Sequence, residues 1–427
     1  MDKISVGIIG MGDMGKLYAS KISDAGWSVN ACDKEDRFES LKAEFAGRNG
    51  ISILRDGYLV SRASDYIIYS VEAEAIDKIV AQYGPSTKLG AIVGGQTSCK
   101  APEIAAFEKH LPHDVDIISC HSLHGPKVDP KGQPLVFIKH RASQKSVDLV
   151  EKILSCFQCK IVHLTAKEHD RITADTQAVT HAAFLSMGTA WHANNQFPWE
   201  IARYIGGIEN VKINVTLRIY SNKWHVYAGL AILNPSAKEQ IRQYATSVTE
   251  LYKLMLGGHR EELEERVKTA GAAVFKSAQA DEELLLRDDV LDRFSLGKAP
   301  QERTPNNHLS LLAMVDCWWK MEIVPYDHML CSTPLFRLWL GVTEYLFRKP
   351  ALLDDVIRIA IEDNTFRSDD LEFTFAARGW SDCVSYGDFP SYRDRFERIQ
   401  KYFSPRFPEA TRVGNEMIKT ILEKTRE

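Results

Sequence analysis

The sequence predicts an α/β protein in which a doubly wound sheet is followed by a mostly α-helical C-terminal region. Two observations support this prediction: short apolar runs alternate with helical patterns over the first 165 residues, and long helical periodicities take over beyond them. The chain has 427 residues, 44% hydrophobic and 26% charged, so it can form more than one core. We therefore expect a first domain at 1–165 and a second at 166–427.

The first predicted strand, residues 4–9, runs into a glycine-rich turn, and a predicted helix, 16–25, follows. The G-x-G-x-x-G spacing allows a tight turn at the first glycine, close approach of the backbone to a pyrophosphate at the second, and close helix packing at the third. This pattern is weak alone, but here it has the strand and helix that it requires. We expect a Rossmann-type dinucleotide site formed by Gly10, Met11, Gly12, Asp13, Met14 and Gly15.

The residues after the second predicted strand, 27–32, bear on the choice of cofactor. Asp33 lies where an acidic residue usually meets the adenosine ribose, which favours NAD. Lys34 and Arg37 follow directly and could pair with a 2′-phosphate, which favours NADP. These three residues alone leave both cofactors open.

The remaining elements follow in order. Further strands are predicted at 66–70, 91–95, 116–120, 135–139 and 160–164, with helices at 75–83, 102–110 and 146–156. Long helices are predicted at 168–192, 234–255 and 260–275. The polar stretch 297–307 predicts a loop that divides the second domain into two helical halves. Residues 227–241 and 342–356 share a helix–proline–helix pattern, which suggests that the halves are related.

Polar residues directly after two strands are candidates for chemistry, because ligands of such sheets bind beyond the carboxyl ends of the strands. His121 could exchange protons near neutral pH beside a nicotinamide, with Ser98 orienting it. Lys100 could hold an anionic substrate group. The alternative is that Ser98 only begins the next helix and His121 is a hydrogen-bonded loop residue.

The second domain offers four more candidates. Gln177 and His181 are four residues apart, so they share one face of the predicted helix, although a single histidine among apolar neighbours is more often a core residue. Arg218 and Arg337 lie in apolar helical sequence, where a guanidinium needs a carboxylate partner from the protein or from a substrate.

Composition and charge exclude several classes of protein. A net charge of −4 gives no attraction for nucleic acid or an anionic membrane, and no apolar run is long enough to span a membrane. The eight cysteines are scattered, as expected for reduced thiols in the cytoplasm. Cys156 and Cys159 have C-x-x-C spacing but no second ligand pair, so no metal site is expected.

Several stretches together resemble the prephenate dehydrogenases, in particular the fungal NADP-dependent type. The resemblance runs over nearly the whole chain. It is carried by Gly7-Ile-Ile-Gly-Met-Gly-Asp-Met-Gly15, Gly94-Gly-Gln-Thr-Ser-Cys-Lys100, His121-Ser-Leu-His-Gly-Pro126, Thr173-Ala-Asp-Thr-Gln-Ala-Val-Thr-His181 and Ile219-Tyr-Ser-Asn-Lys-Trp-His225. It implies NADP as the cofactor, with NAD as the alternative. It also implies oxidative decarboxylation of prephenate to 4-hydroxyphenylpyruvate in tyrosine biosynthesis.

The resemblance also implies roles for the candidates. Ser98 and His121 would flank the nicotinamide, although Ser122 stands where many relatives have proline. His181 would face the substrate, and the substrate carboxylate would bind Arg337 or, with less support, Arg218. A monomer or homodimer is expected.

Three alternatives remain at this stage. An arogenate dehydrogenase differs only in the side chain it accepts. A β-hydroxyacid dehydrogenase would need a G-x(5)-K-x(3)-N pattern, which is not found after residue 165. An NADP-sensing regulatory protein would bind the cofactor without turnover.

Overall fold

The structure is a computed structural model that describes residues 4–126, 128–276, 286, 294, 296 and 306–424. Its contacts divide the chain into two compact units, Met1–Thr173 and Ala174–Glu427. We call them the sheet unit and the helical unit. The predicted fold class is confirmed by these two units.

The sheet unit contains one eight-stranded sheet with the order β3-β2-β1-β4-β5-β6-β7-β8. All neighbouring strands are parallel except β6 and β7. The strands are β1 (Ser5–Ile9), β2 (Ser28–Cys32), β3 (Ile51–Ile53), β4 (Tyr66–Tyr69), β5 (Ile92–Gly95), β6 (Asp116–Ser122), β7 (Pro134–Arg141) and β8 (Lys160–His163). Because β1, β4, β5 and β6 run parallel, their carboxyl ends lie along one edge.

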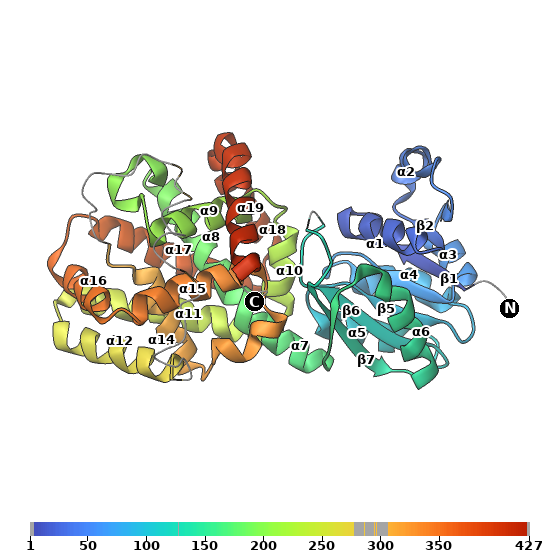
Figure 1. Cartoon of the computed structure of the whole chain (residues 1–427), viewed down its shortest axis with the longest axis horizontal. Helices are drawn as coiled ribbons and strands as arrows, with labels where there is room; N and C mark the ends of the chain where they lie inside the picture. Colours follow the sequence, from blue (N-terminus) through green and yellow to red (C-terminus); the bar gives the residue numbers. More distant parts are fainter. Residues whose placement is uncertain are drawn as a thin grey trace. The chain divides into compact units, whose positions relative to one another are not determined.

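Helices cover both faces of this sheet (Figure 1). One face packs against α1 (Asp13–Asp24), α2 (Phe38–Phe45) and α6 (Gln144–Leu154), and the other against α3 (Gly57–Ala63), α4 (Ile76–Tyr83) and α5 (Lys100–His110). Burial on both faces explains why the strands read as continuous apolar runs. The sequence analysis did not anticipate β3, α2 and α3, which are short and lack a clear period.

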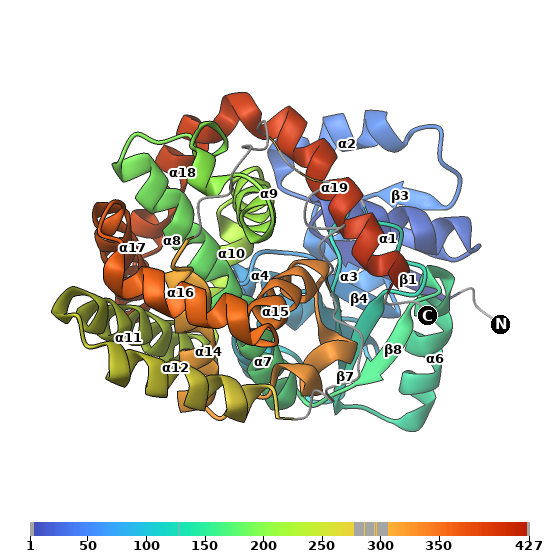
Figure 2. The ribbon, with the colours of Figure 1, turned by 60° about the vertical axis from the view of Figure 1, so that its left-hand side comes forward.

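The helical unit has a single large core that extends from the helices before residue 276 to those after residue 306. Within it, α8 (Val179–Ala193) lies at the centre, against α9, α17 and α18 (Figure 2). The other helices are α9 (Ile208–Tyr220), α10 (His225–Leu233), α11 (Pro235–Gly257), α12 (Arg260–Val274), α14 (Leu309–Lys320), α15 (Pro334–Phe347), α16 (Pro350–Glu362), α17 (Arg367–Tyr386), α18 (Phe389–Phe403) and α19 (Phe407–Lys424).

The predicted helix 168–192 is divided by a change of helical period. It consists of α7 (Ala166–Thr173), a π-helical turn at Ala174–Ala178, and α8. The contacts assign α7 to the sheet unit, where it packs on α5, so the division falls after Thr173 instead of at residue 165. The physical reason is Asp170, whose carboxylate accepts the backbone N–H groups of Lys100 and Ala101 at the start of α5.

Two predictions concern the halves of the helical unit. The shared helix–proline–helix pattern forms in both places, with Pro235 opening α11 and Pro350 opening α16. The predicted dividing loop 297–307 lies outside the described residues except for Asn306 and Asn307.

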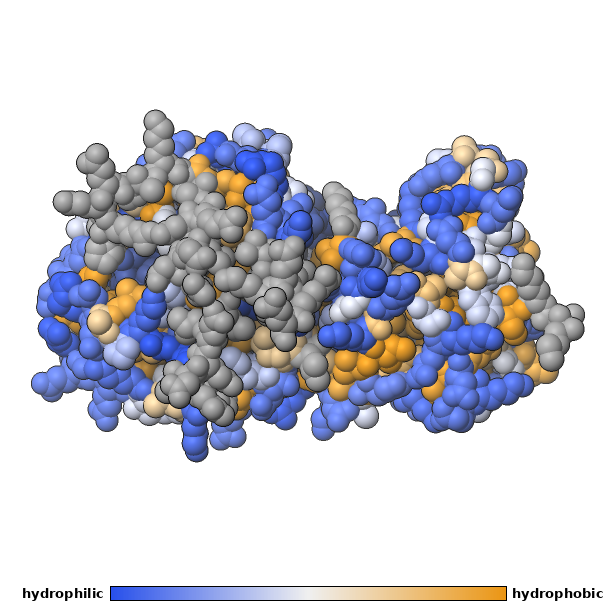
Figure 3. Space-filling view, viewed as in Figure 1, coloured by the Kyte–Doolittle hydropathy of each residue, from blue (hydrophilic) through white to orange (hydrophobic). Residues whose placement is uncertain are grey.

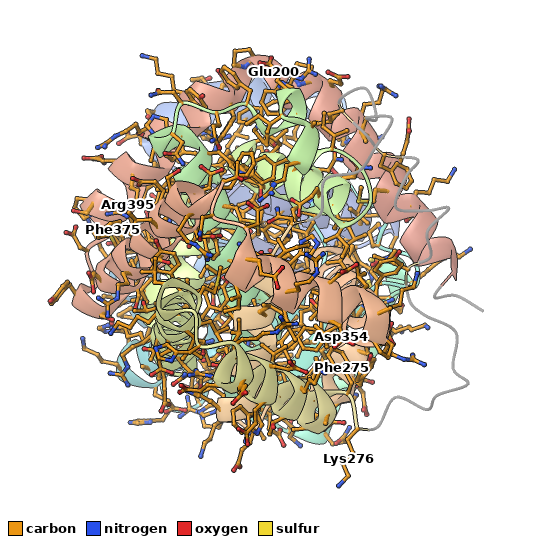
Figure 4. All side chains as sticks on the ribbon, turned by 90° about the vertical axis from the view of Figure 1, so that its left-hand side faces the viewer. Glu200, Phe275, Lys276, Asp354, Phe375 and Arg395 are labelled. Carbon is orange, nitrogen blue, oxygen red and sulfur yellow. The ribbon has the colours of Figure 1, made fainter. Side chains whose placement is uncertain are left out.

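The surface is mainly polar. On the face seen in Figure 3, hydrophilic residues predominate among the coloured atoms, with smaller apolar areas between them. The side chains labelled in Figure 4 lie toward the outside of that view, and among them Phe375 is 63% exposed. In the part of the chain that the structure describes, no helix is both long and apolar enough to cross a membrane.

Candidate active site

The glycine turn between β1 and α1 is shaped by the protein at two of its three glycines. Gly10 has a φ of +103°, donates its N–H to the Cys32 carbonyl, and would bring a Cβ within 2.3 Å of the Ser70 carbonyl oxygen. A Cβ on Gly15 would lie 2.1 Å from the Gly10 carbonyl oxygen. A Cβ on Gly12 would meet nothing within 4 Å.

That open space at Gly12 fits a dinucleotide. Gly12 is the N-cap of α1, and no side chain caps this helix end. The backbone N–H groups of the first turn, which includes Asp13 and Met14, can therefore receive a pyrophosphate, and the helix dipole favours its charge. No protein atom requires a glycine at residue 12, whereas a closely bound phosphate does.

Asp33 is turned toward its own chain. Its carboxylate accepts the backbone N–H groups of Met11 at 3.0 Å and Lys34 at 2.8 Å, and it pairs with the Arg37 guanidinium at 2.5 Å. The side chain of Asp33 is 11% exposed and that of Arg37 is 39% exposed. The carboxylate that would repel a 2′-phosphate is thus neutralised by a cation that a phosphate can also contact.

Arg55 was missed by the sequence analysis. Its guanidinium lies 5.4 Å from the centre of the Phe38 ring, and Phe38 directly follows Arg37. Lys42 lies over the same ring at 5.8 Å. Cations therefore gather beyond β2 from positions that are far apart in the sequence, and no local motif reveals such a group.

The structure contradicts the prediction that Lys100 holds an anionic substrate group. Lys100 is fully buried, and its Nζ donates to Glu103 Oε1 at 2.9 Å and to the carbonyls of Cys120 at 2.9 Å and Gly95 at 3.3 Å. These contacts use all three ammonium protons. Glu103 also accepts from the backbone and hydroxyl of Thr97, so Lys100 fixes the loop after β5 and does not reach a ligand.

Ser98 lies in that loop, half-buried, and its hydroxyl forms no hydrogen bond with a described residue. The bland alternative, in which Ser98 starts α5, is not observed, because the N-cap is Cys99. Since β5 and β6 are adjacent parallel strands, the Ser98 loop and His121 follow the same edge of the sheet.

His121 is the penultimate residue of β6 and lies half-buried at this edge. Its Nδ1 is 2.8 Å from His169 Nε2, and His169 Nδ1 is 2.8 Å from Asp170 Oδ1. Burial lowers the pKa of His121 well below its ordinary value, and the nearby His169 and Lys100 add to the effect. His121 is therefore a neutral imidazole near neutral pH and able to accept a proton.

Sequence reasoning missed His169 and Asp170. Both are buried on α7, at 1% and 5% exposure. They are neighbours in a predicted helix, and no spacing relates them to a histidine 48 residues earlier. Only the packing of α7 against the sheet brings them to His121.

In the helical unit, His181 on α8 lines a cavity together with Tyr227, Trp380 and Tyr392. Gln177 lies one turn earlier, in the π-helical turn. Gln177 Nε2 and His181 Nδ1 are buried without a hydrogen-bond partner among the described residues. Burial lowers the pKa of His181 to about 3. Because buried polar groups are normally satisfied, two such atoms one turn apart indicate a place for a ligand's polar groups.

The two candidate arginines differ in their partners. Arg218 donates to the amide oxygen of Asn415 and has no carboxylate partner in the described part of the chain. It lies near Tyr227, whose ring is 4.8 Å from that of His181. Arg337 donates to Ser332 Oγ at 2.8 Å and to the Met329 carbonyl at 3.1 Å. The structure thus associates Arg218, and not the favoured Arg337, with the His181 group.

Comparison with known proteins agrees with this architecture. A family model of the 6-phosphogluconate dehydrogenase C-terminal domain, in its variant for tyrosine-pathway enzymes, matches residues 178–423. The model of the NAD binding domain of 6-phosphogluconate dehydrogenase matches residues 5–112. A solved prephenate dehydrogenase from Aquifex aeolicus shares the fold, with a TM-score of 0.50 and 17% identity, covering 63% of this chain and 96% of that one.

Two curated relatives are similar over almost their full length. One is a probable NADP+ prephenate dehydrogenase of Schizosaccharomyces pombe, 62% identical over 99% of this chain and 98% of the relative. The other is the NADP+ prephenate dehydrogenase of Saccharomyces cerevisiae, 57% identical over 98% of this chain and 94% of the relative.

The sheet, the glycine turn and the base at its edge define a nicotinamide-dependent dehydrogenase with a 6-phosphogluconate dehydrogenase-like helical unit. Within that class, the chain belongs to the fungal NADP+-dependent prephenate dehydrogenases. The resemblance stated from the sequence motifs is therefore confirmed.

Proposed function

We propose that the chain oxidises and decarboxylates prephenate to 4-hydroxyphenylpyruvate with NADP+, a step of tyrosine biosynthesis. The observation that carries the proposal is the neutral imidazole of His121 at the carboxyl edge of a sheet whose first turn fits a dinucleotide. The curated relatives bear the name of this activity.

Prephenate carries a ring hydroxyl, a ring carboxylate and a pyruvyl side chain. His121 accepts the proton of the ring hydroxyl while the hydrogen on the same carbon leaves as hydride. Bound NADP+ supplies the hydride acceptor. The ring carboxylate departs as carbon dioxide, and its bonding electrons complete the aromatic ring. His121 then returns its proton to solvent after the product has left.

The helical unit provides candidates for substrate binding. His181 and Gln177 offer polar atoms without partners in the described chain, and Arg218 offers a guanidinium without a carboxylate among the described residues. Such a cation gains a charge-assisted hydrogen bond when it meets a carboxylate of prephenate. We assign this role to Arg218 and keep Arg337 as the alternative. Ser98 would contact the nicotinamide or the ring hydroxyl.

Cofactor selection is assigned to the end of β2. Arg37 and Lys34 contact the 2′-phosphate of NADP+, while Asp33 holds Arg37 and the backbone of Met11 in place. Arg55 adds a further cation in this region. We assign the protein to the cytoplasm, since all eight cysteines are free thiols.

The test is a steady-state assay of the purified chain with prephenate or arogenate, each with NADP+ or NAD+. We expect NADPH absorbance to rise with prephenate, and the highest kcat/KM with NADP+. A higher kcat/KM with arogenate or with NAD+ would reverse the corresponding assignment. Tight NADPH binding without turnover of either substrate would favour the regulatory alternative.

His121→Asn tests the base. This variant should bind NADPH as the wild type does, while kcat falls by about 10²- to 10⁴-fold, the contribution typical of a general base. Fluorescence titration with NADPH and the absorbance assay measure the two quantities. Near-normal turnover would remove His121 from this role.

A further inference from the structure

A chain of three buried or half-buried side chains ends at the proposed base. Asp170 Oδ1 is 2.8 Å from His169 Nδ1, and His169 Nε2 is 2.8 Å from His121 Nδ1. All three residues belong to the sheet unit. Both distances are those of hydrogen bonds, and each links one ring nitrogen to one partner.

The position of every proton along this chain follows from Asp170. Hydrogen bonds from His169 and from the backbone N–H groups of Lys100 and Ala101 lower the pKa of Asp170, although burial opposes them. The carboxylate is therefore ionised and can only accept, so His169 carries its proton on Nδ1. Burial lowers the pKa of His169 as well, so its Nε2 is a bare acceptor.

The consequence reaches His121. Because His169 Nε2 accepts, the proton between the two rings must be on His121 Nδ1. A neutral imidazole has one proton, so His121 Nε2 holds a lone pair. That nitrogen is the atom that can accept the hydroxyl proton of a substrate, whereas the other tautomer would place a donor there.

The charged groups around the chain do not alter this order. Lys100 on α5 faces both histidines, but its ammonium is paired with Glu103. His124, in the loop after β6, is a further titratable neighbour of His121, and burial lowers its pKa. Thr173, one turn after His169, donates its hydroxyl to the His169 carbonyl at 2.6 Å.

We propose that His169 and Asp170 are positioning residues that hold His121 in the tautomer that acts as base. This inference rests on the proposed dehydrogenase function. When His121 Nε2 takes the substrate proton, the imidazolium keeps its proton on Nδ1 and donates it to His169 Nε2. The carboxylate of Asp170 balances the new positive charge through His169. No further reactant is needed.

Two substitutions at one position separate positioning from packing. Gln extends far enough to place an amide oxygen near the position of Nε2, so His169→Gln keeps an acceptor for His121. Asn is shorter and reaches only the position of Nδ1, so His169→Asn keeps a donor for Asp170 and removes the acceptor. Both are neutral amides of similar polarity, which makes each the control of the other.

We expect His169→Asn to lower kcat by about 10- to 100-fold, as for other groups that orient a catalytic imidazole, with little change in KM or NADPH affinity. His169→Gln should restore most of kcat. Equal kcat for His169→Asn and the wild type would overturn the proposal. Equal losses in both variants, together with weaker NADPH binding, would also overturn it and show a structural role only.

Nitrogen-15 NMR of histidine-labelled wild-type protein with NADPH tests the tautomer without any variant at residue 169. The signals absent from His121→Asn identify His121, and we expect its Nδ1 to be protonated and its Nε2 bare. A proton on Nε2 overturns the proposal. This measurement requires no turnover, so failure of the dehydrogenase function, seen as no activity with prephenate, is distinguished from failure of the inference.

Discussion

His121 acts through its surroundings, because the same side chain in water would be about half protonated near its ordinary pKa. Burial is the largest cause that lowers the pKa of His121, and the positive potential of His169 and Lys100 follows. Lys100 illustrates the opposite case. It has the right charge for a substrate anion, yet its pairing with Glu103 in the interior removes it from any ligand.

The lowered pKa of His121 determines the acid side of the pH profile. Protonation of Nε2 removes the lone pair, so kcat/KM falls as the pH drops through the pKa of His121. Since this pKa lies well below 6.5, kcat/KM should be constant through neutral pH and fall only at more acidic values. A profile that already declines between neutral pH and 6.5 would contradict this assignment.

Arg218 and Arg337 make a matched pair of substitutions. Arg218→Gln should raise KM for prephenate by roughly 30-fold or more, because a lost charge-assisted contact costs about 2 kcal/mol or more. Arg337→Gln should change KM less, since Ser332 and the Met329 carbonyl hold this side chain in place. Steady-state titration with prephenate measures both values. The reverse order of effects would assign the carboxylate to Arg337.

At the scale of elements, each site residue depends on how its helix or strand begins or ends. The turn between β1 and α1 needs glycine at residues 10 and 15 for the protein's own packing, and at residue 12 for the ligand. The π-helical turn before α8 adds a residue to one helical turn and so changes which side chains share a face. Gln177 lies within this turn, and His181, which lines the cavity of the helical unit, follows it.

Gly12→Ala and Gly15→Ala separate these two requirements. Gly12→Ala should leave the melting temperature nearly unchanged, because its Cβ meets no protein atom, but weaken NADPH binding by about tenfold or more. Gly15→Ala should destabilise the fold itself by about 1–3 kcal/mol, as overpacking does, because its Cβ collides with Gly10. Thermal unfolding and NADPH titration measure both effects. Unaltered NADPH affinity in Gly12→Ala would place the pyrophosphate elsewhere.

At the scale of the whole molecule, the helices after residue 306 complete the core begun by those before residue 276. The central helix α8 packs on α17 and α18, and α11 packs on α14 and α17. In the long fungal type, we infer, the second helical half takes the place that a partner subunit holds in shorter relatives. The apolar faces of the first half are then covered within one chain.

This arrangement predicts a monomer. Sedimentation equilibrium of the purified chain should give the mass of a single chain over a wide range of concentrations. An obligate dimer would contradict the inference, since it would show that the second half does not replace a partner.

Much of the fold followed from local patterns, and the site followed in part. The strand before Gly10 and the helix after it form as predicted, because their apolar periodicity and the glycine spacing are local. The role of Lys100 was wrong, because residue type gives charge but not the direction of the side chain. His169 and Arg55 were not predicted, since the contacts that matter for them come from residues far away in the sequence.

The sequence by itself determined the class of fold, the dinucleotide turn at residues 10–15, the family, and the candidate base His121. Each of these depends on spacing along the chain, which a linear pattern records. Only the tertiary structure decided that Asp33 is paired with Arg37, that Lys100 is buried with Glu103, and that Asp170 and His169 reach His121. These contacts depend on how separate elements pack, and packing fixes the partner, and so the proton, of each buried side chain.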